Sequence, residues 1–293
     1  DNLRLTPNEY RIKVRGEEVA RGEIFVDRYM AIPSGETDGT LSGMKTTEPA
    51  FGLPAVWIGE AEKGRAELMG YTVVSPLAVL STHLTEIIRK HASGLLSRQM
   101  IHEMLDHLKS KTPAAVEGVI TDKISLGEFQ EVLRNLLRER IPIRNLAGIL
   151  EVLERHIGVT RDSKILAEAV RQTMSLTISN LYKDDTGTLH VFTLSPHLET
   201  ILRGSLSSSE GGLGFQIDAD LAQAILNSTG TKMEDVAKKG HMPILLCPRE
   251  IRLAFRRLIE QAFPNLVVLA FSEIGSNIRV QAHGMVEVKQ QQG

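Results

Sequence analysis

The residues with the clearest chemical meaning form an apolar segment, not a catalytic set. Residues 45–58 contain Phe51 and the single tryptophan of the chain, Trp57, interrupted by Pro and Gly and edged by the carboxylate of Glu48. Neither a nucleophile, nor a set of metal ligands, nor a phosphate-binding loop accompanies them. Aromatic side chains next to a few polar groups are typical of contacts with another protein. The first hypothesis is therefore binding of a protein partner.

The two aromatic residues of this segment have different expected positions. Trp57 lies in a short apolar run and is expected to be buried in the core of its own subdomain. Phe51 stands between Pro49 and Gly52, which predict a loop. Loops carry binding residues disproportionately, so we expect the Phe51 side chain to face a partner.

A glycine cluster at Gly211–Gly214 is the main alternative source of chemistry. It resembles half of a dinucleotide-binding fingerprint, which should follow a strand and open a helix. A Ser-rich segment precedes the cluster, and residues 205–214 as a whole predict a loop. The alternative function is a multidomain enzyme with a ligand site near Gly211–Gly214.

Other polar residues give weaker signals. Asp184-Asp185 is followed by Thr-Gly and is interpreted as a turn, while His102 and His107 lie five residues apart and point to different sides of a helix. We therefore expect no metal site, no cofactor and no catalytic residue. His83 lies beside the apolar segment; a hydrogen bond to nearby backbone is favoured there over a pH-sensing or ligand role.

Composition excludes several classes of function. The chain has 293 residues, 42% of them hydrophobic, and a formal net charge of -2, which argues against nucleic-acid binding and against a basic membrane-binding face. Its single cysteine, Cys247, fits a reducing compartment and is expected to be buried at a strand end. No run of 18 apolar residues is present. Because the chain begins without Met, we expect that a preceding membrane segment is missing.

The first part of the chain has the patterns of a small unit with helices and strands. Apolar and polar residues alternate over 10–14 and 19–26 around Arg15-Gly16-Glu17, which predicts a hairpin. The further elements expected are a loop at 34–43, strands at 56–58 and 71–74, and a helix at 60–69.

From Pro76 onward the apolar residues recur at helical spacing. Two helices are expected before Pro113, with a break at Ser93-Gly94. The following helices have recognisable N-caps: Ser125 with Glu128 in a capping box, Asn145 before 146–156, and Asp162 before a helix towards Leu181.

The last third alternates strands with helices, which predicts an α/β unit with parallel pairing and right-handed crossovers. The expected elements are a strand at 189–194, a short helix from Pro196, a helix at 218–226, a strand at 244–246, a helix at 249–262, a strand at 266–269 and paired strands near 278–281 and 285–288.

Motifs spread over the whole chain carry a resemblance to a known family. They are Ala31-Ile32-Pro33, Gly39-Thr40-Leu41, Pro49 to Ile58, Ser81-Thr82-His83-Leu84, Asn135-Leu136-Leu137, Ile141 to Leu146 and Pro264 to Leu269. In this order they resemble the cytoplasmic domain of the export gate proteins of flagellar and virulence type III secretion. The Phe51-Gly52-Leu53 run favours the flagellar branch.

The resemblance implies an α+β multidomain fold of four small subdomains. The boundaries it implies are 1–26 with 76–95 for the first subdomain, 27–75 for an inserted second, 96–175 for a mainly helical third and 176–293 for an α/β fourth. The change of pattern at Pro76 and the helical middle of the chain agree with these boundaries. The first subdomain of such proteins is usually preceded by further sequence, so we expect this chain to be truncated at its N-terminus.

The function implied by the resemblance is that of a non-enzymatic docking platform at the cytoplasmic face of the bacterial inner membrane. Such proteins assemble into a nine-subunit ring. Their partners are export chaperones with bound substrates and components of the export ATPase complex, with no nucleic acid. Contact with the membrane is expected only through the missing N-terminal part.

The resemblance also implies a binding site in a dimple between the first two subdomains. The carboxylate, aromatic and threonine residues of that site match Glu48, Phe51 and Thr82, although Asp is more usual in the family where Glu48 stands. Val74, Val79 and Leu80 are expected to add apolar area. Glu48 and Thr82 would form the polar rim that orients a partner helix.

Overall fold

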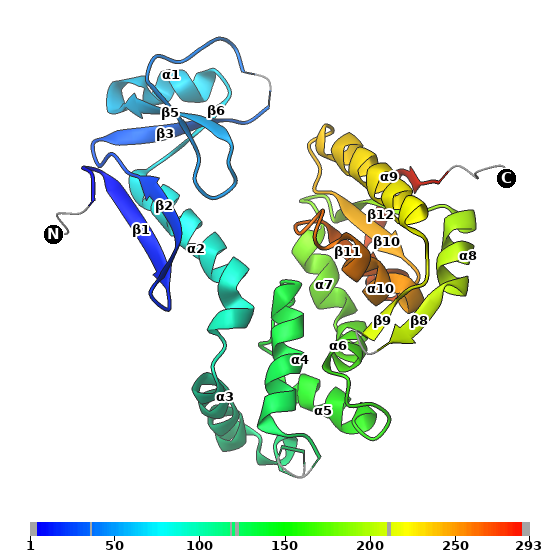
Figure 1. Cartoon of the computed structure of the whole chain (residues 1–293). Coiled ribbons are helices and arrows are strands. Elements are labelled where there is room, and N and C mark those ends of the chain that lie inside the picture. Colours follow the sequence, from blue (N-terminus) through cyan, green and yellow to red (C-terminus); the bar gives the residue numbers. More distant parts are fainter. Residues whose placement is uncertain (1–4, 36, 118, 121–122, 210–211, 289–293) are drawn as a thin grey trace. The chain divides into compact units, whose positions relative to one another are not determined.

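A computed structural model describes residues 5–35, 37–117, 119–120, 123–209 and 212–288 (Figure 1). The chain divides into two compact units, residues 1–100 and residues 101–293. Each unit contains both helices and strands, so the predicted α+β multidomain class is confirmed. None of the helices in the described residues is long and apolar enough to cross a membrane.

Unit 1 opens with the predicted hairpin, formed by β1 (Glu9–Val14) and the antiparallel strand β2 (Glu17–Glu23). A separate four-stranded antiparallel sheet follows, in the order β4-β5-β3-β6. Its strands are β3 (Arg28–Pro33), β4 (Met44–Thr47), β5 (Pro54–Gly59) and β6 (Tyr71–Val74). The sequence patterns predicted β5 and β6 but neither β3 nor β4.

Strand β3 was not predicted, because apolar side chains pack against both of its faces. Met30 packs with Trp57 and Val79 on one face, whereas the next residue, Ala31, packs with Ile58 on the other. A strand that is buried on both faces has no alternation of apolar and polar residues. The predicted burial of Trp57 is confirmed, since only 1% of it is exposed.

Helices cover the two faces of this sheet. The short helix η1 (Glu60–Glu62) and α1 (Lys63–Leu68) occupy the region predicted as one helix. The long helix α2 (Pro76–Leu95) begins at Ser75, whose side chain caps it by accepting a hydrogen bond from the backbone N–H of Ala78. The predicted break at Ser93-Gly94 is wrong: α2 continues through Gly94, and the next helix, α3 (Arg98–Lys111), starts after a two-residue link.

Unit 2 begins within α3 and continues with further helices. Its elements are η2 (Pro113–Ala115), α4 (Leu126–Arg138), α5 (Leu146–His156), α6 (Ser163–Gln172) and α7 (Ser175–Tyr182). The predicted caps Ser125, Asn145 and Asp162 are all present, and Ser125 forms the full capping box with Glu128. The single helix predicted after Asp162 is instead two, because the chain turns at Thr173, whose hydroxyl donates to the carbonyl of Val170.

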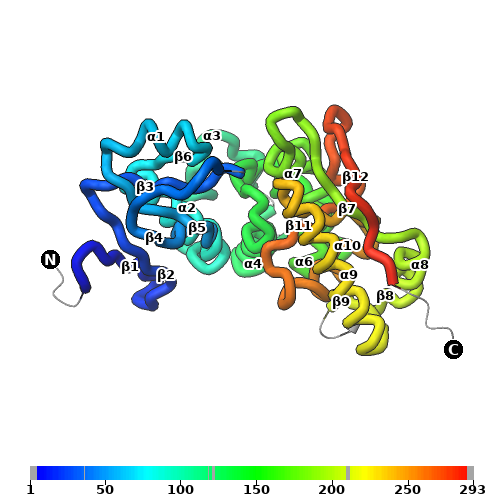
Figure 2. The backbone as a smooth tube through the Cα atoms, turned by 90° about the horizontal axis from the view of Figure 1, so that it is seen from above, coloured from blue at the N-terminus to red at the C-terminus, as the bar shows by residue number. Residues whose placement is uncertain are grey.

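The rest of unit 2 is built on a four-stranded sheet in the order β11-β10-β7-β12, and every pair in it is parallel (Figures 1 and 2). The strands are β7 (Thr188–Leu194), β10 (Ile244–Cys247), β11 (Val267–Ala270) and β12 (Arg279–Val286). Three helices, α8 (Pro196–Gly204), α9 (Ala219–Ala237) and α10 (Arg249–Ile259), share one core with these strands. The short helix η3 (Phe271–Glu273) follows β11. The parallel pairing is as predicted.

Three local predictions for this part were wrong. The segment interpreted as a loop contains a hairpin of β8 (Leu206–Ser209) and β9 (Gly212–Phe215). Helix α9 runs much further than the predicted end at Leu226. The two strands expected at the C-terminus are one strand, β12, whose register shifts between Ala282 and Met285. Cys247 is buried at the end of β10, as predicted.

Candidate functional site

Unit 1 contains a cavity of about 200 Å³ where its sheet meets α2. Strands β3 and β6 supply Ile32 and Val74, the loop between β4 and β5 supplies three residues, and the first turns of α2 supply three more. The lining residues are Ile32, Glu48, Phe51, Leu53, Val74, Ala78, Val79 and Thr82. Segments that are distant in the sequence thus form one mainly apolar hollow with a carboxylate and a hydroxyl beside it.

The loop between β4 and β5 is held by Glu48. Only 3% of this residue is exposed, and its two carboxylate oxygens accept hydrogen bonds from the backbone N–H groups of Ala50 (2.9 Å) and Phe51 (2.7 Å). Its own backbone bonds to Leu53 and Gly52 close the turn, which Gly52 completes with a φ of +73°. Glu48 therefore organises the loop from inside.

Phe51 projects from this loop and remains 63% exposed. Leu53, on the other side of Gly52, is also exposed. Exposure of two large apolar side chains at the mouth of one cavity costs hydration free energy, which a partner that covers both would recover. The expectation that Phe51 is presented by a loop agrees with this geometry.

Helix α2 turns one narrow face towards the cavity. Ala78, Val79 and Thr82 follow one another on that face, with Val79 buried and Thr82 exposed. Leu80 is not among the described residues that line this cavity, so its assignment to the site stays a prediction. A helix rotates by about 100° per residue, so Leu80 lies beyond Val79, on the side away from Ala78 and Thr82.

A buried histidine lies next to the cavity wall. The hydroxyl of Tyr10, on β1, and Nδ1 of His83, on α2, are joined by a 2.6 Å hydrogen bond. The expected bond from His83 to nearby backbone is therefore replaced by a contact with a residue 73 positions away. Burial lowers the pKa of His83, opposed in part by the charge of Glu48, while burial and the same charge raise the pKa of Tyr10 to about 12.

The described lining of the cavity is suited to binding. Its polar members are one carboxylate, engaged with backbone, and one hydroxyl on a helix surface. A nucleophile would need an activating base within hydrogen-bond reach, and none of the described lining residues provides one. An apolar hollow with a polar edge suits an amphipathic helix of another protein.

Comparison with known proteins places this geometry in a family. The profile of the FHIPEP family matches residues 1–279. The chain belongs to the FHIPEP family. Flagellar biosynthesis protein FlhA of Bacillus subtilis (strain 168) is 39% identical over 288 residues, which are 98% of this chain and 42% of that protein. The FlhA protein of Escherichia coli (strain K12) is 34% identical over 281 residues, 96% of this chain and 40% of that protein.

The chain thus spans about two fifths of the length of these curated relatives. The family predicted from the motifs is confirmed, and its members are export gate components, not enzymes. The enzyme alternative is therefore wrong. Gly211 lies outside the described residues, and Gly212 to Gly214 belong to β9, paired with β8, instead of opening a helix as a phosphate-binding loop would.

Solved structures of similar proteins share the fold. The Chlamydia pneumoniae CdsV protein matches with a TM-score of 0.84 at 28% identity, over 98% of this chain and 82% of that chain. CdsV in its complex with CdsO matches with a TM-score of 0.82 at 27% identity, over 98% and 83% of the two chains. The nonameric EPEC SctV-C has a TM-score of 0.76 at 20% identity, over 95% and 84%.

Sequence reasoning missed some members of the site for identifiable reasons. Ile32 belongs to β3, the strand whose alternation is hidden, although it stands within the Ala31-Ile32-Pro33 motif. Ala78 is too small to stand out in a pattern of large apolar residues. The Tyr10–His83 hydrogen bond joins β1 of the hairpin to α2, and no local sequence pattern predicts a contact between residues 73 positions apart.

Proposed function

We propose that this chain is the cytoplasmic docking platform of a flagellar type III export gate, at the cytoplasmic face of the bacterial inner membrane. It binds export chaperones carrying their substrates through the cavity lined by Phe51, Val74 and Val79. The observation that carries the proposal is the exposed Phe51 at the edge of an apolar hollow, on a loop that Glu48 holds in place. The flagellar names of the curated relatives support the choice of system.

Further partners follow from the same family. The similarity to CdsV, which has been solved with CdsO, supports contact with a component of the export ATPase complex. The similarity to the nonameric SctV-C supports assembly into a nine-subunit ring. The four subdomains, 1–26 with 76–95, 27–75, 96–175 and 176–293, are part of this proposal; the two compact units of the chain are a coarser division.

Within the cavity we assign different tasks to the three residues matched from the family. Phe51 supplies the apolar anchor, because it is the larger and more exposed of the two apolar side chains at the edge. Glu48 keeps the anchor in position through its bonds to the backbone of residues 50 and 51. Thr82, exposed on α2, is available to hydrogen-bond a polar group of the partner.

The test is calorimetry with a purified cognate chaperone bound to its substrate. Phe51→Ala is expected to weaken binding by about 2 kcal/mol or more, as a central anchor does. Leu68→Ala is the matched control: Leu68 is also a large exposed apolar residue of unit 1, 90% exposed on α1, but outside the cavity. It should leave the affinity unchanged.

Two outcomes would overturn the assignment. One is an unchanged affinity of the folded Phe51→Ala variant. The other is an equal loss in both variants, which would indicate general apolar adhesion instead of a defined site. The near-ultraviolet signal of the buried Trp57 reports whether unit 1 remains packed in each variant.

A further inference from the structure

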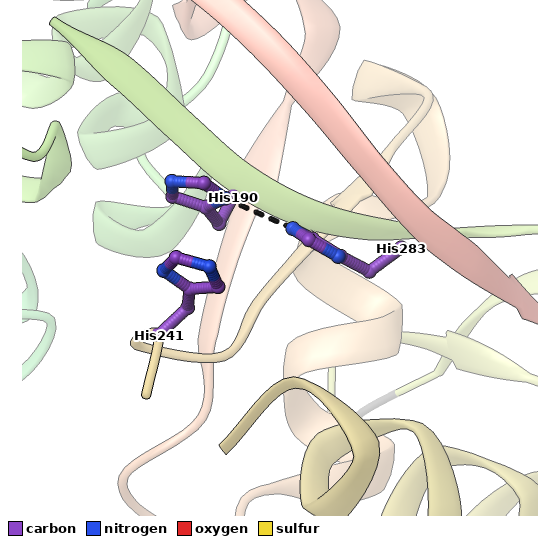
Figure 3. A group of neighbouring side chains, drawn as sticks. All are labelled: His190, His241 and His283. Atoms are coloured by element: carbon purple, nitrogen blue, oxygen red, sulfur yellow. Dashed lines mark hydrogen bonds between the residues drawn. The ribbon is translucent and has the colours of Figure 1, made fainter. Parts of the chain in front are cut away.

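Three histidines from separate segments of unit 2 meet beside the parallel sheet (Figure 3). His190 lies on β7, His283 on β12, and His241 in the link between α9 and β10. One ring nitrogen from each can be chosen so that all lie within 4.8 Å of one another. The three residues are 42 to 93 positions apart, so their spacing in the sequence does not predict that they meet.

An irregularity of β12 brings His283 into this group. Ala282 pairs with Val191 and Met285 with Thr193, so His283 and Gly284 together stand opposite one residue of β7. Gly284 has a φ of +128°, which a residue with a side chain rarely adopts. Such bulges redirect side chains, and this one turns the His283 ring towards His190, with Nε2 of His283 at 2.9 Å from Nδ1 of His190.

A carboxylate fixes the tautomer of His190. Its Nε2–H donates to Oδ2 of Asp184 at 3.0 Å, which leaves Nδ1 as the nitrogen that faces His283. The other oxygen of Asp184 accepts from the backbone N–H groups of Thr186 and Thr188, both at 2.9 Å, so the carboxylate itself is held firmly. A histidine that binds a metal through one nitrogen and a carboxylate through the other is the usual arrangement in protein metal centres.

We propose that His190, His241 and His283 form a binding site for a divalent transition metal of the zinc type. Three neutral imidazoles suit Zn²⁺, Ni²⁺ and Co²⁺, and a solvent molecule would complete four-coordination. Metal–nitrogen bonds of about 2.0–2.1 Å place the ligand atoms of a tetrahedral centre roughly 3.3 Å apart. The His190–His283 pair, at 2.9 Å, is already near that spacing, and all three ligand atoms lie within 4.8 Å of one another. The bound metal would clamp β7, β12 and the link before β10 together.

Two adjustments accompany metal binding. The His241 ring stacks on that of His190, with centroids 3.5 Å apart and an interplanar angle of 7°, so it must tilt to direct a nitrogen at a shared metal. Nζ of Lys239 lies 3.4 Å from Nδ1 of His283. When Nε2 of His283 binds the metal, its proton moves to Nδ1, and the exposed Lys239 side chain must leave. The positive charge of Lys239 therefore opposes metal binding.

The experiment is titration of the full, tag-free chain with Zn²⁺ by calorimetry and with Co²⁺ by visible absorption. One equivalent per chain and the intense bands of four-coordinate Co²⁺ are expected. His283→Gln and His241→Gln should each lower the affinity at least about tenfold, and His241 lies in a link whose substitution spares the sheet. Asp184→Asn keeps all three ligands but should weaken binding by roughly 10- to 100-fold.

Two further variants distinguish a metal centre from incidental binding. Lys239→Gln should bind at least as tightly as the natural chain, because it removes the opposing charge. His197→Gln, at an exposed histidine of α8 in the same unit, should change nothing. Absence of stoichiometric Zn²⁺ binding, or equal affinity in the natural chain and the folded His241→Gln variant, would overturn the proposal and leave a hydrogen-bonded histidine cluster.

Discussion

His83 is a buried base near Glu48, whose carboxylate is hydrogen-bonded to the backbone of its own loop. Its imidazole bonds to the Tyr10 hydroxyl, and the charge of Glu48 is close enough to act on both groups. Burial lowers the pKa of His83 more than Glu48 raises it. The neutral imidazole is therefore the form that the folded unit favours, directly behind the cavity of the proposed docking site.

This pKa shift predicts how the stability of unit 1 depends on pH. The unfolded chain takes up the proton at a pKa of about 6.5, whereas the folded state resists it, so stability is complete above that pH and falls as the pH drops below it. Urea unfolding followed by Trp57 fluorescence should show a lower free energy of unfolding at about pH 5.5 than at about pH 7.5. In His83→Gln this decrease should be smaller. An identical pH dependence in both proteins would contradict the assignment.

Helices and strands of unit 2 are joined by a buried network of ions. Arg252, on α10, is fully buried and donates to Glu139, at the end of α4, and to Glu168, on α6. Arg171, on α6, bonds to Glu139 and to Glu273 of η3. Burial alone would raise the pKa of Glu139, but Arg171 and Arg252 outweigh it and hold that pKa at about 2. The helical part is thereby tied to the sheet.

Removing Arg252 should therefore be costly. Arg252→Met removes the arginine that Glu168 binds and one of the two that Glu139 binds, and it takes a fully buried charge out of the network, so a loss of roughly 3–5 kcal/mol in the free energy of unfolding is expected. Arg203→Met is the control, because the Arg203–Glu250 pair is about half exposed and should contribute at most about 1 kcal/mol. Denaturant unfolding followed by circular dichroism measures both. Equal effects would mean that the network adds little.

The elements that local chemistry determines could be predicted, and those that tertiary contacts determine could not. Ser125 and Glu128 predicted the start of α4, because both partners of a capping box lie within four consecutive residues of the sequence. The Ser- and Gly-rich strands β8 and β9 have little intrinsic β-propensity and persist through their pairing and through Arg257, which donates to the carbonyl of Leu213. No pattern within 205–214 reveals that distant guanidinium.

The candidate site shows the same limit. Glu48, Phe51 and Thr82 could be named because they stand in motifs of a recognisable family, not because their spacing implies a cavity. The role of Glu48 inside its loop, the lining by Ile32 and the Tyr10–His83 pair all depend on how the sheet packs on α2. The histidine group at His190 was missed for the same reason: its members meet only through parallel strand pairing and a bulge.

The chain as a whole is two compact units with separate cores, and this makes a prediction about unfolding. Trp57, the single tryptophan, is buried in the core of unit 1 and reports on that unit alone. Most of the helices belong to unit 2, so circular dichroism reports mainly on that unit. Domains with their own cores unfold independently unless a large interface couples them. The two signals should therefore give different denaturant midpoints.

The variants described above sharpen this test because each acts within one unit. Arg252→Met should lower the midpoint of the circular dichroism transition and leave the Trp57 transition in place, since every partner of Arg252 in the network belongs to unit 2. His83→Gln should do the reverse, because Tyr10 and His83 both belong to unit 1. If both signals shifted together in either variant, the units would unfold as one cooperative body, and the separate cores would not define separate folding units.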